Sequence, residues 1–219
     1  ELAGHRLRIS RERSLMGTGG GLAVARDRGL LGDDGPVLVI NGDSVVNLEL
    51  EPLLQRHDTA RDLVTLALLP HPNPRRWSRV RIDDGGAVAG IRPAGDPEPD
   101  EVPLLYPGVM LISRRALDSL PSTPGGVDRV LWWPALEAGR LGGVVVAGRW
   151  REIGTPSDYR SEVLRRVEAR PWVDPRARVE DSATIDRSLV GAGCRVAAGA
   201  RVVRSILAEG VRVEAGATV

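Results

Sequence analysis

The sequence predicts an α/β domain followed by a coil of short stacked strands, and three observations support this fold class. The chain has 219 residues, enough for one large domain or for a medium domain with a smaller one. Short apolar runs alternate with helix-like segments over residues 14–156. The C-terminal 47 residues repeat with a period of 17. We expect a Rossmann-like domain with a mixed, mostly parallel sheet at 1–156, a linker helix at 157–171 and a left-handed β-helix at 172–219.

The elements of the first region follow from local patterns. Short apolar runs predict buried strands, and glycine-rich turns and proline-started segments predict hairpins and helices. We expect strands at 36–41, 62–69, 107–113 and 143–147, and a hairpin with strands 79–83 and 87–91. Helices are expected at 20–29, 51–60 and 127–138. Thr155 caps a further helix that runs to about Arg170, since Pro171 follows.

The C-terminal repeat places one apolar residue on each side of a three-sided coil. The apolar residues are spaced 6, 6 and 5 apart, and glycines occupy many of the turns between them. This pattern resembles the hexapeptide repeat of left-handed β-helices. An Arg-Ser pair recurs at Arg187-Ser188 and Arg204-Ser205, and Cys194 takes a small, inward-leaning position. The predicted columns are Val173, Val190, Leu207; Val179, Val196, Val213; and Ile185, Val202, Val219.

Composition excludes several classes of protein. The net charge is +1, which argues against a nucleic-acid-binding face. A single cysteine excludes a disulfide framework. No apolar run approaches the ~18 residues of a membrane span, and we expect a cytoplasmic protein without membrane or nucleic-acid partners. All 30 basic residues are arginine, so no lysine can serve as an anchor or base.

Two carboxylates and a glycine run are candidates for chemistry. Asp43 follows a predicted strand in Asn41-Gly42-Asp43, where α/β sheets bind ligands, and it could hold Mg²⁺ or simply form a turn. Glu152 precedes Ile153-Gly154-Thr155 and by itself could be a surface residue. The run Gly17-Thr18-Gly19-Gly20 precedes a helix and could present backbone amides to an anion or a base, or be a flexible loop.

Taken in order, these segments resemble the sugar-1-phosphate nucleotidylyltransferases. The resemblance rests on Glu12 with Leu15-Met16-Gly17-Thr18-Gly19-Gly20, on Asn41-Gly42-Asp43, and on Trp150-x-Glu152-Ile153-Gly154-Thr155-Pro156-x-x-Tyr159. It extends to the C-terminal β-helix, and it is closest to the mannose-1-phosphate guanylyltransferase-like group. The resemblance implies transfer of a nucleotidyl group from an NTP to a sugar 1-phosphate, with release of pyrophosphate.

The resemblance also assigns roles to residues. Asp43 and Glu152 would be the catalytic pair that binds Mg²⁺, with Glu152 standing where the family usually has Asp. The nucleotide would contact Gly17, Thr18, Gly19 and Gly20, together with Asn41 and Gly42. The sugar phosphate would contact Gly108 and Arg92, although Arg92 stands in Ile91-Arg92-Pro93 where the family has Glu-Lys-Pro and could be a surface arginine.

Departures from the family pattern leave a second function open. The glycine-rich triphosphate loop of the family is absent, so we expect an incomplete Rossmann-like domain in an inactive fragment that lacks the first strand. The alternative is a non-catalytic regulatory subunit that binds nucleotide-sugar, because Glu152 replaces the usual Asp, the sugar-phosphate lysine is missing and Tyr106-Pro107-Gly108 replaces the usual Asn-Ala-Gly. An acyltransferase is disfavoured because residues 172–219 contain no histidine. We expect the β-helix to form a homo-oligomer.

Overall fold

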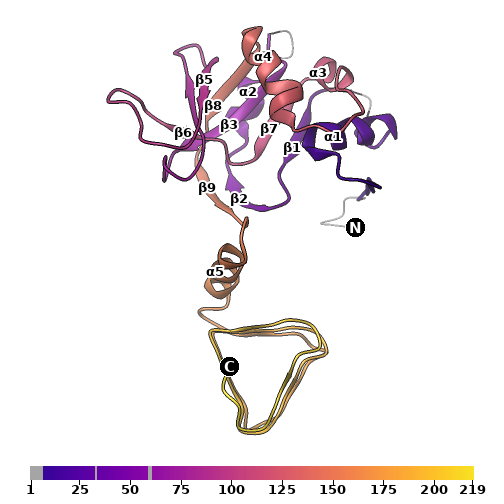
Figure 1. Ribbon diagram of the computed structural model, residues 1–219, viewed down its shortest axis with the longest axis vertical. Helices are drawn as coiled ribbons and strands as arrows, with labels where there is room; N and C mark the ends of the chain where they lie inside the picture. The colour runs from indigo at the N-terminus through magenta and orange to yellow at the C-terminus, as the bar shows by residue number, and fades with distance from the viewer. Residues whose placement is uncertain (1–6, 33, 59–60) are drawn as a thin grey trace. The chain divides into compact units, whose positions relative to one another are not determined.

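The computed structural model describes residues 7–32, 34–58 and 61–219. The chain divides into two compact units, Glu1–Arg151 and Glu152–Val219. The first unit contains the sheet and most of the helices, and the second contains one helix and the coil (Figure 1). None of the helices in the described part of the chain is long and apolar enough to cross a membrane.

The main sheet of the first unit has seven strands in the order β1-β7-β3-β6-β4-β5, with β8 paired to β3. The β4–β5 hairpin and the positions of β1, β3, β7 and β8 agree with the prediction, whereas β6 was not predicted. The strands are β1 (Val37–Ile40), β3 (Val64–Pro70), β4 (Arg79–Ile82), β5 (Val88–Arg92), β6 (Leu104–Leu105), β7 (Val109–Ile112) and β8 (Leu141–Val145).

The prediction of a mostly parallel sheet is wrong for the described strands. Strand β7 lies between β1 and β3 and is antiparallel to both, and β3–β8 is the parallel pair of this sheet. Strand β1 was expected to be buried, yet it stands at the end of the strand order, and Leu38 and Ile40 are 39% and 48% exposed. Apolar runs indicate burial on both faces but carry no information about strand direction, because antiparallel strands between two covering layers are equally apolar.

Alternate side chains of β3 and β7 build a core on each face of this sheet. On one face, Leu66, Leu68 and Met110 pack with residues of α1 (Gly17–Asp27), α3 (Arg114–Asp118), a π-helical turn η1 (Asp128–Trp132) and α4 (Trp133–Glu137). On the other face, Ala67 and Val109 pack with α2 (Glu51–Arg56) and with the ribbon formed by β2 (Ser44–Leu48) and β9 (Gly148–Glu152).

Several element boundaries differ from the prediction. Helix α1 begins at Gly17 rather than Gly20, so the glycine run forms its first turn. Helix α2 ends at Arg56, and the last two residues of the predicted helix, 59 and 60, lie outside the described residues. The ribbon of β2 and β9 and the short helix α3 were not predicted, because neither strand of the ribbon has a continuous apolar run.

The second unit begins with α5 (Pro156–Arg166) and continues into a triangular coil (Figure 1). Its strands form parallel sheets β10-β13-β16, β11-β14-β17 and β12-β15. The register pairs Val173 with Val190 and Val190 with Leu207, as the predicted columns require. The strands are β10 (Trp172–Val173), β11 (Arg178–Val179), β12 (Thr184–Asp186), β13 (Leu189–Val190), β14 (Arg195–Val196), β15 (Arg201–Val203), β16 (Ile206–Leu207) and β17 (Arg212–Val213).

The central residues of the apolar columns form the interior of the coil, whereas Val173 and Val219 at the ends of their columns are 39% and 48% exposed. Val190 and Val202 are fully buried and Val196 is nearly so, and Cys194 packs among them as a buried thiol, as expected. Each coil hydrogen-bonds to the next through backbone groups, for example from Arg178 N to Cys194 O at 2.8 Å. Stacking of identical turns therefore supplies both the hydrogen bonds and the core of this unit.

Thr155 caps α5 as the sequence predicts. Its hydroxyl oxygen accepts a hydrogen bond from Asp158 N at 3.1 Å, and the helix ends at Arg166, one turn earlier than expected. We expect Thr155→Ala to lower the free energy of unfolding by about 1 kcal/mol, because the amide loses its partner. Chemical denaturation measures this loss, with Ser157→Ala, an exposed change in the same turn, as the control. Equal losses in the two variants would contradict a capping role.

Candidate functional site

The first part of the candidate site is formed where two turns meet at the end of β1. Asn41 N donates a hydrogen bond to Gly108 O at 2.8 Å, so the turn after β1 is joined to the turn before β7. Gly108 has φ +84, and a Cβ there would lie 2.8 Å from the Asn41 Cβ. A residue with a side chain does not fit this position without displacing Asn41. The structure thus brings together two segments, one of which the resemblance predicts to bind nucleotide and the other to bind sugar phosphate.

Asp43 lies two residues beyond this contact and is exposed, between Gly42 and the start of β2. The neighbouring Ser44 is held by Trp150, whose indole Nε1 donates to the Ser44 hydroxyl at 3.3 Å. Trp150 lies on β9, and the ribbon of β2 and β9 therefore anchors the segment that carries Asp43. An exposed carboxylate on an anchored turn is available to a cation or to a substrate.

Glu152 is the last residue of β9 and is half-buried, and it begins the second unit. In the described part of the chain, no three histidine, cysteine, aspartate or glutamate side chains are grouped so that they could hold a metal ion by themselves. Mg²⁺ sites commonly use only one or two carboxylates, with substrate phosphates and water as the other ligands. The donor chemistry of Asp43 and Glu152 therefore fits such an ion, and their pairing stays a prediction.

The predicted nucleotide loop packs against a second glycine turn. Gly19 N and Gly20 N both donate to Gly125 O, at 3.0 and 3.3 Å, and Gly125 N donates to Met16 O at 2.8 Å. An added Cβ on Gly19 would lie 2.4 Å from Val130 Cγ2. These amides are therefore used inside the protein, and the glycines permit a close approach of two backbones. Contact of the loop with a base stays a prediction.

Arg92 is not brought to this place. It lies on β5, at the opposite end of the sheet order from β1, and it forms an ion pair with Glu98. Both side chains are well exposed, at 42% and 52%. Arg92 lies on a strand distant from β1 and already has a carboxylate partner. It is therefore a poor match for a sugar-phosphate anchor beside Gly108. The position of Arg92 agrees with the alternative that it is a surface arginine. No contact among the described residues supports a sugar-phosphate role for Arg92.

Tyr106 is a residue that the sequence reasoning missed. Tyr106-Pro107-Gly108 lies between β6 and β7, and both of these strands pair antiparallel with β3. Its hydroxyl is buried and has no hydrogen-bond partner among the described residues. Burial raises the pKa of the phenol well above its usual range, so the group remains a neutral donor. A buried hydroxyl without a partner costs ~1–3 kcal/mol, and a bound ligand can offset that cost.

The Tyr106 ring is held at a defined angle by its neighbour on η1. Tyr106 and Trp132 pack edge to face with ring centroids 4.7 Å apart, and Trp132 Nε1 lies 3.3 Å from Met110 Sδ. η1 also carries Val130, which contacts the glycine run. A π-helical turn thus connects the predicted nucleotide loop with the segment before Gly108. The glycine pair at 125 and 126 was the sequence signal that could have indicated this turn.

The chain is similar in sequence to several known proteins. No family model matches the chain. A mannose-1-phosphate guanylyltransferase of Mycobacterium tuberculosis is 31% identical over 176 residues, covering 77% of this chain and 47% of that protein. The chain is homologous to the sugar-1-phosphate nucleotidylyltransferases. Mannose-1-phosphate guanylyltransferase 1 of Arabidopsis thaliana is 25% identical, covering 87% of this chain and 54% of that protein.

A solved structure is similar to this chain at the level of the fold. HddC from Yersinia pseudotuberculosis superposes with a TM-score of 0.55 at 19% identity, covering 68% of this chain and 62% of that one. Another member of the family, a glucose-1-phosphate adenylyltransferase of Thermomicrobium roseum, is 28% identical over 184 residues. The chain spans about half the length of the curated relatives that it matches. The printed names of these relatives differ in base and in sugar.

Proposed function

We propose that the chain serves the transfer of a nucleotidyl group from an NTP to a sugar 1-phosphate, which yields an NDP-sugar and pyrophosphate. The observation that carries the proposal is the contact between Asn41 and Gly108, beside the exposed Asp43. This contact joins two segments, one predicted to bind nucleotide and the other sugar, at one end of β1 in a chain homologous to enzymes of this reaction. GTP and mannose 1-phosphate are the first substrates to test, because several relatives are named for that pair.

The residues of the chain would act by positioning the reactants. Gly108 has no side chain, so Asn41 packs directly against the backbone before β7, and the Tyr106 hydroxyl could donate to a sugar or phosphate oxygen. Asp43 and Glu152 would hold Mg²⁺, which would supply neutralisation of phosphate charge. The phosphate oxygen of the sugar 1-phosphate would attack the α-phosphorus of the NTP, and pyrophosphate would leave.

The test is a change of Asp43 in the natural protein that carries this sequence. We expect Asp43→Asn to lower kcat for pyrophosphate release by about 10²-fold or more, because the amide no longer neutralises a cation. The assay uses GTP, mannose 1-phosphate and Mg²⁺, and then the other NTPs and sugar phosphates. Asp84→Asn is the control, since Asp84 is also exposed and lies in the β4–β5 turn. Unchanged turnover in Asp43→Asn would contradict the proposal.

A regulatory subunit that binds nucleotide-sugar without turnover is the second candidate. The position of Arg92, paired with Glu98 far along the sheet order from β1, favours it. Saturable binding of GDP-mannose without pyrophosphate release by the wild-type protein would identify this function. We further propose that the triangular coil is a left-handed β-helix that assembles subunits, and that the protein acts in the cytoplasm. Light scattering on variants of the exposed Trp172 tests the assembly.

A further inference from the structure

The recurring Arg-Ser pairs of the coil have no part in the proposed reaction. Their serines have a structural role. The buried Ser188 hydroxyl donates to Asp186 O at 2.7 Å and accepts from Ser205 N at 3.0 Å, 17 residues later. The bond to Asp186 closes the corner within one coil, and the bond from Ser205 connects that coil with the next. These hydrogen bonds give a reason for the recurring serine, but not for the arginine that precedes it.

The arginines of the two pairs adopt an unusual backbone conformation. Arg187 has φ +42 and Arg204 has φ +48, and they are the non-glycine residues with positive φ in the described chain. Other turns of the coil with positive φ use glycine, for example Gly193 and Gly210. Glycine adopts this conformation without a steric penalty, whereas an arginine does not. Backbone conformation alone would favour glycine at these corners, so the presence of Arg187 and Arg204 requires another explanation.

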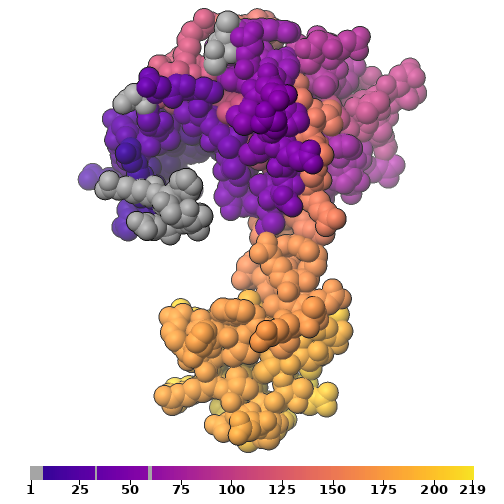
Figure 2. All heavy atoms as spheres, turned by 180° about the vertical axis from the view of Figure 1, so that it is seen from behind, coloured from indigo at the N-terminus to yellow at the C-terminus, as the bar shows by residue number. Residues whose placement is uncertain are grey.

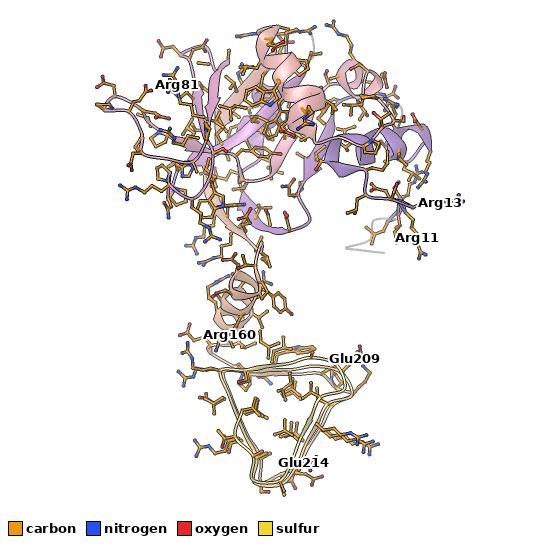
Figure 3. The ribbon with its side chains drawn as sticks, in the orientation of Figure 1. Arg11, Arg13, Arg81, Arg160, Glu209 and Glu214 are labelled. Atoms are coloured by element: carbon orange, nitrogen blue, oxygen red, sulfur yellow. The ribbon has the colours of Figure 1, made fainter. Side chains whose placement is uncertain are left out.

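The two arginines line a small pocket together with residues of α5. The pocket has a volume of about 250 Å³, and Arg160, Ser161 and Arg165 line it from the helix. All of these residues belong to the second unit. Arg160 Nη2 donates to Arg204 O at 3.1 Å, which connects the helix with the corner of the coil. Figure 3 shows Arg160 beside the coil, and Figure 2 shows the atoms of this unit as a continuous body.

Positive charge exceeds negative charge at this pocket. Arg165 is paired with Glu162 and Arg187 with Asp186. Arg160 and Arg204 form no ion pair with a carboxylate in the part of the chain that the structure describes. Glu168 is the one carboxylate among the lining residues. The guanidinium groups of Arg160 and Arg204 therefore have hydrogen-bond donors that no carboxylate among the described residues uses, and the Ser161 hydroxyl lies in the same pocket.

We propose that this pocket binds a small phosphate anion, either orthophosphate or pyrophosphate. Guanidinium groups recognise phosphate oxygens through paired hydrogen bonds, and the Ser161 hydroxyl can add another donor. A volume of about 250 Å³ lies below the usual size of pockets for whole organic ligands, ~300–1,000 Å³, and suits a compact anion. The pocket is separate from the residues of the proposed nucleotidyl transfer, because its lining includes neither Asp43 nor Glu152.

The test measures anion binding to the full chain by isothermal titration without Mg²⁺. Orthophosphate and pyrophosphate are titrated in turn, with sodium chloride at matched ionic strength as the reference. We expect saturable binding of one of the two, and the comparison identifies which. Arg204→Gly and Arg160→Gln are expected to weaken it at least tenfold, because each removes a guanidinium from the pocket. Arg195→Gln is the control, since Arg195 is exposed on β14 and does not line the pocket.

Arg204→Gly also separates loss of binding from loss of structure. Glycine suits the positive φ of this corner, so the variant is expected to unfold at the same or a higher temperature than the wild type without anion. Reduced binding in a variant of unreduced stability would support the site. Equal affinity in Arg204→Gly, Arg160→Gln and Arg195→Gln would overturn it. A response to phosphate no larger than the response to chloride would overturn it as well.

Discussion

Glu101→Gln is expected to lower the free energy of unfolding by about 3–5 kcal/mol, because it leaves a buried arginine without a counter-charge. Glu101 forms an ion pair with Arg79, and their side chains are only 1% and 8% exposed. Arg79 Nε also donates to Pro93 O, and Glu101 Oε2 accepts from Glu98 N at 3.0 Å. The pair thus ties the segment before β6 to β4. Only a small part of Arg79 is exposed, so water compensates poorly for the lost charge.

A matched pair in the same region is the control for this prediction. Arg92 and Glu98 also form an arginine–glutamate ion pair, but their side chains are 42% and 52% exposed. We expect Glu98→Gln to cost no more than about 1 kcal/mol, because solvent screens the exposed charges. Urea denaturation of both variants at low and high salt gives the comparison. Similar losses for the two variants would show that burial does not determine the contribution of the Glu101 pair.

Gly148→Ala is expected to destabilise the first unit by about 3–5 kcal/mol, from backbone strain and overpacking together. Gly148 begins β9 with φ +140, a region that residues with side chains rarely adopt. An added Cβ would lie 2.2 Å from Asn47 O and 2.8 Å from Leu48 Cα. Both atoms belong to the backbone of β2, so relief requires separation of the two strands of the ribbon.

The control for Gly148 is a glycine with strain but with free space. Gly139 has φ +64, and no atom lies within 4 Å of a Cβ built there. Gly139→Ala should therefore cost about 1–2 kcal/mol, the strain alone. Thermal and chemical unfolding measure both variants. Because β2 follows Asp43 directly, Gly148→Ala should also lower any turnover that depends on Asp43, even below the unfolding temperature. A loss equal to that of Gly139→Ala would contradict the close packing of the ribbon.

The sequence by itself determined the coil in detail. The register of Val173, Val190 and Leu207 follows directly from the period of the apolar residues, because each turn repeats the same local geometry. The positions of most strands in the first unit, the β4–β5 hairpin and the cap of α5 were also predicted. These features depend on residues close together in the chain, so a short window of sequence contains the information.

Only the tertiary structure decided the order and direction of the strands and the composition of the site. β7 lies between β1 and β3 because of long-range pairing, which apolar runs do not encode. The same folding joins Asn41 to Gly108 and leaves Arg92 paired with Glu98 elsewhere. The burial of the Tyr106 hydroxyl, which has no partner in the described part of the chain, also depends on this packing. Contacts between segments far apart in the chain depend on the packing of the whole unit, and local sequence patterns cannot specify them.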